Sequence, residues 1–445
     1  MKTILLTSFH NFTARNILVA PFLKLLTEKA DVRVVILVPE GKVSFYEKEF
    51  GGENIAVEGV SGRLRRVDTI FKGFAFAAMR TKSANLMRKV NIGVEHEHPL
   101  QKFFFWAPLF RCMVPRLYAL IMPKNAYADL FEKYTPSLLF ATDAFSAVDN
   151  RLLHEARIRG IKTVSMVRSW DNLTTKGILR VLPDILVVNN DILKKEAIQL
   201  HRVPEDRIAV VGIPFHDRYM GGPKHSRKEF ITSISGRLDK KLIVYAALGD
   251  PLFPGHNYFD VAIIDLLVKA IPETQQLLVR LPPAMGVMLD GLESRDKILL
   301  ERPGVQQGSN PNNVSKTELG IADDDHLIDT LFYADVFIAV TTTMLLDATL
   351  CDRPTIVIDF DFREGKWSKD APSELLYYSH MQPLLKSGGV RIVQSPAELS
   401  RAIQEYIQNP SKDHEGRMRT RSEIAHIYDG HASELLLWVI RDALL

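Results

Sequence analysis

The chain has 445 residues, 46% of them hydrophobic and 24% charged, which is typical of a globular protein with two domains of roughly 200 residues each. Its formal net charge of +3 does not indicate a nucleic-acid partner. No run of about 18 uncharged apolar residues occurs, so no membrane-spanning helix is predicted, and the apolar start is too short for a signal peptide. The two cysteines are far apart and lie in apolar surroundings, which disfavours disulfides and thiolate metal sites and favours a reducing cytoplasm.

The first half of the chain alternates between buried strands and amphipathic helices. We predict strands at 2–7, 32–38, 137–141, 163–168, 184–188 and 208–211, and helices at 14–29, 150–159 and 191–200. This alternation is typical of an open, parallel sheet with helices on its faces. Ligands of such sheets gather at the carboxyl ends of the strands.

Polar residues follow these strand ends. Ser8, His10 and Asn11 come after the first strand and Asp143 after the strand at 137–141, so we expect them to face a ligand cleft. His10 could act as a base or could only cap a helix. A longer polar loop, 169–177, follows the strand at 163–168.

The segment from about 60 to 135 interrupts this alternation of strands and helices. It holds several aromatic residues with interspersed Lys and Arg, among them Lys102, Arg111 and Arg116. Two interpretations stay open: a helical insertion that covers the sheet, or a peripheral contact with a membrane interface through 60–124.

A basic, polar linker is expected at 219–240. The second half then repeats the first, with predicted strands at 242–247, 276–281, 336–340 and 355–360 and helices at 259–270, 326–333 and 344–350. Residues 284–325 are rich in loops. Gly249 lies in the turn after the first of these strands, and Arg280 lies near the end of the second.

Three threonines stand between the strand at 336–340 and the following helix. Thr341, Thr342 and Thr343 would place hydroxyls and unpaired backbone N–H groups at a helix N-terminus, which suits a pyrophosphate. Asp347, one turn further on, would reach the ribose or sugar hydroxyls of the same ligand. The alternative is that the threonines only cap the helix.

The tail predicts a last helix at 433–444. Gly430 can take a positive φ and Ser433 stands where an N-cap would be. Together these patterns predict an α/β protein with two Rossmann-like, doubly wound domains facing each other across a cleft. The expected domains are 1–218 with the insertion at about 60–135, the linker, and 241–425, followed by a helix at 426–445 that crosses back to the first domain.

Several short motifs between 137 and 440 resemble the bacterial CDP-glycerol glycerophosphotransferases, which belong with the two-domain GT-B glycosyltransferases. They are the ADV strand from Ala334, the small hydroxyl residues with Asp347 and Pro354 behind them, the YDGHASE stretch from Tyr428, VVGIPFHDRY at 210–219 and SWDNLTTKG at 169–177. The last resembles the acceptor loop of that family. The resemblance implies a nucleotide-dependent transferase of the cell envelope, with Trp170 and Asn172 at the acceptor.

The departures from this family bear on the donor. Val340 stands where the family has an acid, Pro282 where it has a histidine, and Asp171 where its acceptor loop has a histidine. A nucleotide-sugar donor is therefore at least as well supported as CDP-glycerol.

For a GT-B enzyme we expect a base that deprotonates the acceptor hydroxyl and groups that stabilise the departing phosphate. Asp171 is the preferred base, and the alternative role for it is to fix its own turn; Asp143 and His10 are the other candidate bases. The predicted donor-binding residues are Gly249, Arg280, Thr341, Thr342, Thr343, Asp347, Gly430 and Ser433; the predicted acceptor-binding residues are Ser8, Asn11, Trp170 and Asn172.

No metal and no cofactor are predicted, because helix ends and Arg can carry the charge of the leaving group, and the acidic run at 323–325 fits a solvated turn. Three functions are to be separated: sugar transfer from a nucleotide donor to a surface polysaccharide or lipid-linked acceptor, polyol-phosphate transfer from CDP-glycerol, and 2-epimerisation of a UDP-sugar. The expected location is the cytoplasm, with peripheral contact at the inner face of the membrane.

Overall fold

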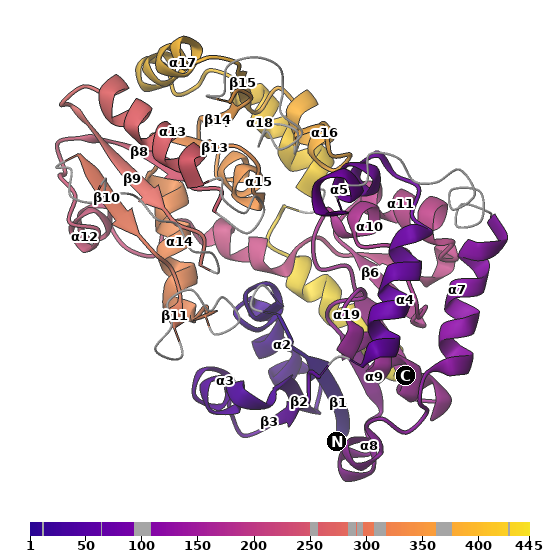
Figure 1. The fold of residues 1–445 in the computed structure, drawn as a ribbon. Coiled ribbons are helices and arrows are strands. Elements are labelled where there is room, and N and C mark those ends of the chain that lie inside the picture. Colours follow the sequence, from indigo (N-terminus) through magenta and orange to yellow (C-terminus); the bar gives the residue numbers. More distant parts are fainter. Residues whose placement is uncertain are drawn as a thin grey trace. The chain divides into compact units, whose positions relative to one another are not determined.

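The computed structural model describes residues 1–10, 13–63, 65–92, 108–249, 257–283, 291, 297–306, 317–361, 376–425 and 428–445. Two compact units make up the chain (Figure 1). Unit 1 comprises Met1–Arg218 and His426–Leu445, and unit 2 comprises Tyr219–Ala425. Each contains one parallel sheet with helices on its faces, which confirms the predicted α/β class with two doubly wound sheets.

The first sheet has seven strands in the order β3-β2-β1-β4-β5-β6-β7, and every pair is parallel. Its strands are β1 (Lys2–Thr7), β2 (Val32–Pro39), β3 (Ile55–Val60), β4 (Leu138–Ala141), β5 (Lys162–Met166), β6 (Ile185–Val188) and β7 (Ile208–Val210). Helices cover both faces, so the central strands are continuous apolar runs rather than alternating ones. β4, for instance, is buried at all four positions.

The helices of unit 1 connect these strands. They are η1 (Ala14–Leu18), α2 (Pro21–Lys29), η2 (Glu40–Lys42), α3 (Val43–Phe50), α4 (Arg66–Ala77), α5 (Lys82–Ile92), α7 (Pro108–Ile121), α8 (Ala128–Tyr134), α9 (Ala147–Ile158), α10 (Asn172–Thr175), α11 (Asp191–His201), η3 (Glu205–Arg207), η4 (Pro214–Gly221, whose last residues lie in unit 2) and α19 (Ala432–Leu444). The single helix predicted at 14–29 is wrong: it is split in two, because Pro21 has no N–H to donate and instead occupies the first turn of α2.

The interrupting segment is helical where the structure describes it. Phe71 of α4, Tyr118 of α7 and Phe131 of α8 are buried in one cluster with Leu5 and Leu139 of the sheet. The segment therefore covers one face of the first sheet, as the helical-insertion interpretation predicts. Lys102 lies outside the described residues.

The C-terminal helix returns to unit 1, as predicted. Leu436 and Ile440 of α19 are buried among residues of β1, α2 and β2, and Figure 1 shows the helix beside α2. The helix begins at Ala432, with His431 as its N-cap residue, so the predicted start at Ser433 is one residue late.

The second sheet has six parallel strands in the order β10-β9-β8-β13-β14-β15. They are β8 (Lys241–Ala246), β9 (Gln275–Arg280), β10 (Ile298–Glu301), β13 (Val336–Ala339), β14 (Thr355–Ile358) and β15 (Arg391–Val393), and β11 (Val305–Gln306) pairs with β12 (Thr317–Glu318) separately. The helices are α12 (Arg227–Ser233), α13 (Asn257–Ala270), α14 (Ile321–Tyr333), α15 (Thr343–Leu350), α16 (Met381–Lys386), α17 (Pro396–Gln408), α18 (His414–Thr420) and η8 (Arg421–Ala425).

Two features of unit 2 differ from the sequence expectation. The stretch expected as a linker contains α12, whose Ser226 and Glu229 form a capping box. Helix α14 starts five residues earlier than predicted, because Asp323 accepts hydrogen bonds from the N–H groups of Gly304 and Gly320 and thereby caps its first turn. The acidic run at 323–325 thus has a capping role in the fold.

Candidate active site

Each sheet has one point where the strand order reverses. In the first sheet this switch point lies between β1 and β4, and in the second it lies between β8 and β13. Loops leave in opposite directions there, which opens a crevice at the carboxyl ends of the two strands, where open α/β sheets bind ligands.

At the first switch point, two threonines join the strand ends. The Thr7 hydroxyl donates to Asp149 Oδ1 at 2.5 Å and accepts a hydrogen bond from the Thr142 N–H at 2.9 Å. Asp149 is 1% exposed; burial and then the negative charge of Asp143 raise its pKa to about 7. A carboxyl group that is partly protonated at neutral pH thus lies directly beneath the loop that carries Asp143.

Asp143 and Arg168 pair above this network. Arg168 Nε lies 3.2 Å from Asp143 Oδ2, and the other carboxylate oxygen accepts from the Phe145 N–H at 3.0 Å. Burial and the positive charges of Arg168, Lys176 and Lys42 lower the pKa of His10, although the residue keeps an exposed surface. Since Arg168 acts on His10 and pairs with Asp143, the three residues gather at one switch point.

Asp171 belongs to a neighbouring loop. It precedes the short helix α10, where one of its carboxylate oxygens accepts from the Thr175 hydroxyl at 2.9 Å. Burial and then the charge of Asp171 raise the pKa of Glu196 to about 7. Asp171 thus both fixes its own turn and lies near a second acidic group, two strands away from β1.

The predicted acceptor residues occupy different environments. Ser8 is fully buried and its hydroxyl donates to Tyr46 Oη at 3.3 Å, and Trp170 is 8% exposed. Asn172 is 1% exposed, and neither polar atom of its side chain has a hydrogen-bond partner among the described residues. Asn11 lies outside the described part of the chain.

At the second switch point, the three threonines follow β13. Thr342 is the N-cap of α15 and accepts a hydrogen bond from the Met344 N–H at 3.3 Å. Thr341 contacts Met381 Sδ at 3.8 Å, whereas Thr343 is exposed. Thr342 therefore caps the helix, and Thr343 remains at the surface.

Opposite these threonines, across the switch point, a buried carboxylate shapes the turn after β8. Asp260, 2% exposed, accepts hydrogen bonds from the Tyr245 hydroxyl at 2.7 Å and from the N–H groups of Leu248 at 2.9 Å and Gly249 at 3.0 Å. Gly249 has a φ of +81°, a conformation that favours glycine. The turn is thus held rigidly by a residue that the sequence analysis did not single out.

Arg280 ends β9, the neighbour of β8. It is 6% exposed and forms an ion pair with Glu301, which also lies 3.1 Å from His326 Nε2. Burial raises the pKa of Glu301, but the charge of Arg280 and the contact with His326 outweigh it, so the pKa is lowered. The charge of Arg280 is therefore shared with a carboxylate in this structure.

The other predicted donor residues lie elsewhere. Asp347 is 3% exposed within α15, and its charge contributes to the raised pKa of the buried Cys351 thiol. Gly430 has the expected positive φ, +87°. The Ser433 and Ala432 N–H groups at the start of α19 donate to the Asp217 carboxylate at 2.7 and 3.0 Å.

Sequence reasoning missed Arg168, Asp149 and Asp260. The position of Arg168 at a strand end was the signal for it, whereas Asp149 and Asp260 lie inside helices and reach the switch points only through the fold.

Within the described ranges, no three His, Cys, Asp or Glu side chains are grouped so as to hold a metal ion; metal independence stays a prediction. No helix in those ranges is long and apolar enough to span a bilayer.

Comparison with known proteins reveals relatives in structure only. No protein-family model matches the chain, and no curated protein matches it significantly. Among solved structures, S. aureus MnaA, in a co-structure with UDP, aligns with a TM-score of 0.59 at 11% identity over 100% of this chain and 97% of that one. The wall teichoic acid polymerase TagF aligns with a TM-score of 0.53 at 13% identity over 100% and 89%.

A putative UDP-N-acetylglucosamine 2-epimerase from Listeria monocytogenes aligns with a TM-score of 0.56 at 11% identity, covering 99% of this chain and 96% of that one. These identities show the fold alone. With its two parallel sheets and returning C-terminal helix, the chain has the GT-B fold that glycosyltransferases share with UDP-N-acetylglucosamine 2-epimerases.

Proposed function

We propose that the protein is a glycosyltransferase that transfers a sugar from a nucleotide-activated donor to a surface polysaccharide or lipid-linked acceptor. The observation that carries this proposal is the second switch point. There, the N-terminus of α15 with the exposed Thr343 lies across from the rigid turn at Gly249. Helix N–H groups and hydroxyls at such a point suit a diphosphate.

Structural neighbours support a nucleotide-sugar as the donor. MnaA was solved with UDP, and a UDP-N-acetylglucosamine 2-epimerase from Neisseria meningitidis, with a TM-score of 0.55, was solved with UDP-N-acetylglucosamine. A glycosyltransferase from Rickettsia africae also shares the fold, with a TM-score of 0.50. We assign the diphosphate to Thr341–Thr343 and the Gly249 turn, with Arg280 as a positive group behind them.

For the proton acceptor we favour Asp143. It lies at the first switch point beside Arg168 and His10, whereas Asp171 is engaged in its own turn. A carboxylate held by an Arg at a fixed distance is a positioned base, and general base catalysis contributes about 10²- to 10⁴-fold. The neutral His10 would then accept or orient an acceptor hydroxyl.

A donor panel tests the proposal. The melting temperature is measured with UDP-, GDP- and CDP-sugars, CDP-glycerol and CMP-linked sugars. A ligand at 100 times its Kd stabilises the folded state by about 2.7 kcal/mol. A sugar nucleotide that stabilises the protein, and is consumed only when an acceptor extract is added, supports transfer; absence of stabilisation by every nucleotide would overturn the enzyme assignment.

A 2-epimerase is the second candidate, because UDP-N-acetylglucosamine 2-epimerases are among the structural neighbours, with TM-scores of 0.56 and 0.55. This reaction requires acid and base groups around one sugar. Incubation with UDP-N-acetylglucosamine and no acceptor distinguishes the two functions: an epimerase yields a second UDP-sugar, whereas a transferase leaves the donor intact or slowly hydrolyses it. Transfer of polyol phosphate, which the resemblance to the CDP-glycerol glycerophosphotransferases implies, would instead release CMP from CDP-glycerol.

A further inference from the structure

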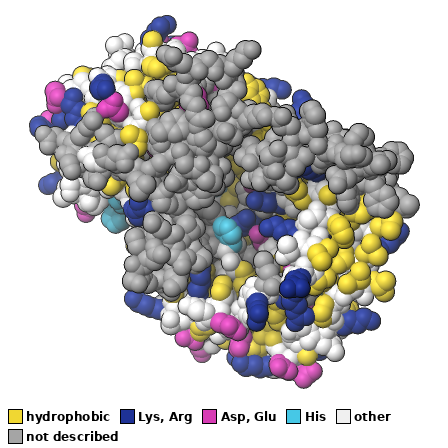
Figure 2. Space-filling view, viewed as in Figure 1, with side chains coloured by type: hydrophobic (Ala, Val, Ile, Leu, Met, Phe, Trp, Pro, Cys, Tyr) yellow, Lys and Arg dark blue, Asp and Glu magenta, His cyan; other side chains and the backbone are white. Residues whose placement is uncertain are grey.

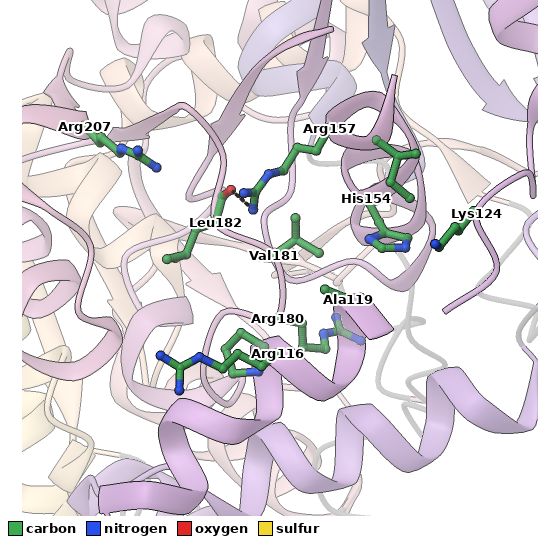
Figure 3. A pocket seen from close by; sticks show the side chains of 11 residues that line it. Arg116, Ala119, Lys124, His154, Arg157, Arg180, Val181, Leu182 and Arg207 are labelled. Atoms are coloured by element: carbon green, nitrogen blue, oxygen red, sulfur yellow. Dashed lines mark hydrogen bonds between the residues drawn. The ribbon is translucent and has the colours of Figure 1, made fainter. Parts of the chain in front are cut away.

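A cationic pocket lies in unit 1. It has a volume of about 530 Å³ and is lined by side chains of α7, of α9, of the segment that leads into β6 and of η3 (Figure 3). Its polar lining consists of Arg116, Lys124, His154, Arg157, Arg180 and Arg207. Because α9 ends before β5, and Leu182 and Arg207 precede β6 and β7, the pocket lies toward the amino ends of these strands.

The charge of this pocket is not balanced by acids. Among the residues that the structure describes, none of the five Lys and Arg side chains forms a salt bridge, and no Asp or Glu lines the pocket. The acids that act on Arg180 electrostatically are Asp68, Asp143 and Asp149. Of these, Asp68 lies 3.8 Å from Arg151 and Asp143 lies 3.2 Å from Arg168.

One of the cations is built into the protein. Arg180 is 4% exposed; its Nη2 donates to the Phe145 carbonyl oxygen, but its Nη1 is buried and has no hydrogen-bond partner in the described part of the chain. His154 is 6% exposed and its Nε2 likewise lacks a partner there. Burial of a charged donor costs free energy unless it is paired, so the guanidinium of Arg180 favours an anion nearby.

The surface next to the pocket is apolar. Leu120 and Ile121 of α7 are 76% and 55% exposed, and Ile158, which lines the pocket, is 46% exposed. On the face in Figure 2, hydrophobic side chains gather, with Lys and Arg beside them, where Figure 1 draws α4 and α7. Arg111 does not belong to this surface, because it donates to the Leu200 carbonyl oxygen at the end of α11.

We propose that this pocket binds a phosphate-bearing group. Arg side chains from four segments line this cavity, and a guanidinium can donate two parallel hydrogen bonds to the oxygens of a phosphate. The exposed leucine and isoleucines favour a phosphate carried by a lipid, since apolar side chains beside cations suit an anionic membrane interface.

The test compares two double variants of the full chain. Arg116→Glu/Arg207→Glu reverses two exposed cations of the pocket, and Lys24→Glu/Lys48→Glu makes the same change of net charge on α2 and α3 of the same unit. Flotation is measured with phosphatidylglycerol and with phosphatidylcholine vesicles, and the melting temperature is measured with inorganic pyrophosphate. All four exposed positions tolerate substitution, which the melting temperature without ligand verifies.

We expect the wild type to float with phosphatidylglycerol vesicles and not with phosphatidylcholine, and the pocket variant to bind roughly tenfold more weakly, while the control variant stays within about twofold. Stabilisation by pyrophosphate alone, lost only in the pocket variant, would assign the site to a soluble phosphate compound and still support the proposal. If neither probe binds, or if both variants weaken binding equally, the pocket is not a phosphate site.

Discussion

The two switch points share their topology but differ in chemistry. At the first, ionisable side chains gather: His10, Asp143 and Arg168, with Asp149 beneath them at a pKa of about 7. At the second, the groups nearest the crevice are hydroxyls and backbone, and the buried charges are tied into the fold, as in the pair of Arg280 with Glu301. Similar sheets thus present ionisable side chains at the switch point of unit 1, and hydroxyl and backbone N–H groups at that of unit 2.

This difference indicates a division of labour. A base needs an ionisable group held in a defined position, which the first switch point offers. A diphosphate needs N–H and hydroxyl donors, and at the second switch point the start of α15 with the exposed Thr343 is suited to supply them. The proposed transfer reaction needs both, and changes at the two points should therefore affect different measurements.

The largest expected effect is on turnover, from Asp143→Asn. Losing the proposed base should lower kcat about 100-fold or more, while stabilisation by the sugar nucleotide stays unchanged, because that ligand is assigned to unit 2. The matched variant Asp171→Asn should lower kcat less than tenfold, since Asp171 bonds to Thr175. A larger loss of kcat in Asp171→Asn than in Asp143→Asn would assign the base to Asp171. A loss of nucleotide binding in Asp143→Asn would contradict the assignment of base and donor site to different units.

Asp260→Ala should cause the largest loss of stability at the second switch point. It removes the acceptor of the Tyr245 hydroxyl and of the Leu248 and Gly249 N–H groups, and each buried donor without a partner costs about 1–3 kcal/mol. We expect unfolding in urea to show a loss of about 4 kcal/mol. Asp265→Ala, on the same helix, removes a surface pair with Lys269, which is worth about 0.2–1 kcal/mol; equal losses in the two variants would contradict the account of the turn.

His201 makes unit 1 sensitive to acid. Its Nδ1 accepts from the Leu179 N–H at 3.1 Å and its Nε2 donates to the Leu173 carbonyl at 2.8 Å, and burial lowers its pKa from 6.5 to about 4. On acidification, His201 is therefore protonated in the unfolded chain before it is protonated in the folded protein. The contribution of neutral His201 to the free energy of unfolding is complete above pH 6.5, and about 3 kcal/mol of it is lost as the pH falls toward 4.

Comparison with His201→Gln isolates this effect. The pKa values of Asp149 and Glu196 are raised to about 7, so these two groups stabilise the folded state on acidification. They act against the destabilisation by His201, and they do so equally in the wild type and the variant. The difference in unfolding free energy between wild type and variant should therefore shrink from pH 6.5 to pH 4. Parallel curves would show that His201 does not titrate in this range.

The fold could be predicted to a large extent from the sequence, whereas the charge partners could not. β1 spans the predicted residues, and β13, α15 and β14 follow the predicted order, because short apolar runs bounded by turn residues define strands locally. That Arg168 meets Asp143, or that Asp260 holds the Gly249 turn, depends on the order of strands in the sheet and on which helical face is buried. Such pairings join residues distant in the chain, and no local pattern encodes them.

The smallest effect distinguishes the two interpretations of the threonines after β13. Thr342→Val removes the hydroxyl that caps α15 and should lower stability by about 1 kcal/mol. Thr343→Val removes an exposed hydroxyl and should leave stability within about 0.5 kcal/mol. If the hydroxyl binds a donor phosphate, however, Thr343→Val should weaken nucleotide-sugar binding roughly tenfold, since hydrogen bonds to charged groups contribute about 1.5–3 kcal/mol. If Thr343→Val binds the nucleotide-sugar as tightly as the wild type, the threonines act only as a helix cap. The diphosphate must then bind at another part of the second switch point.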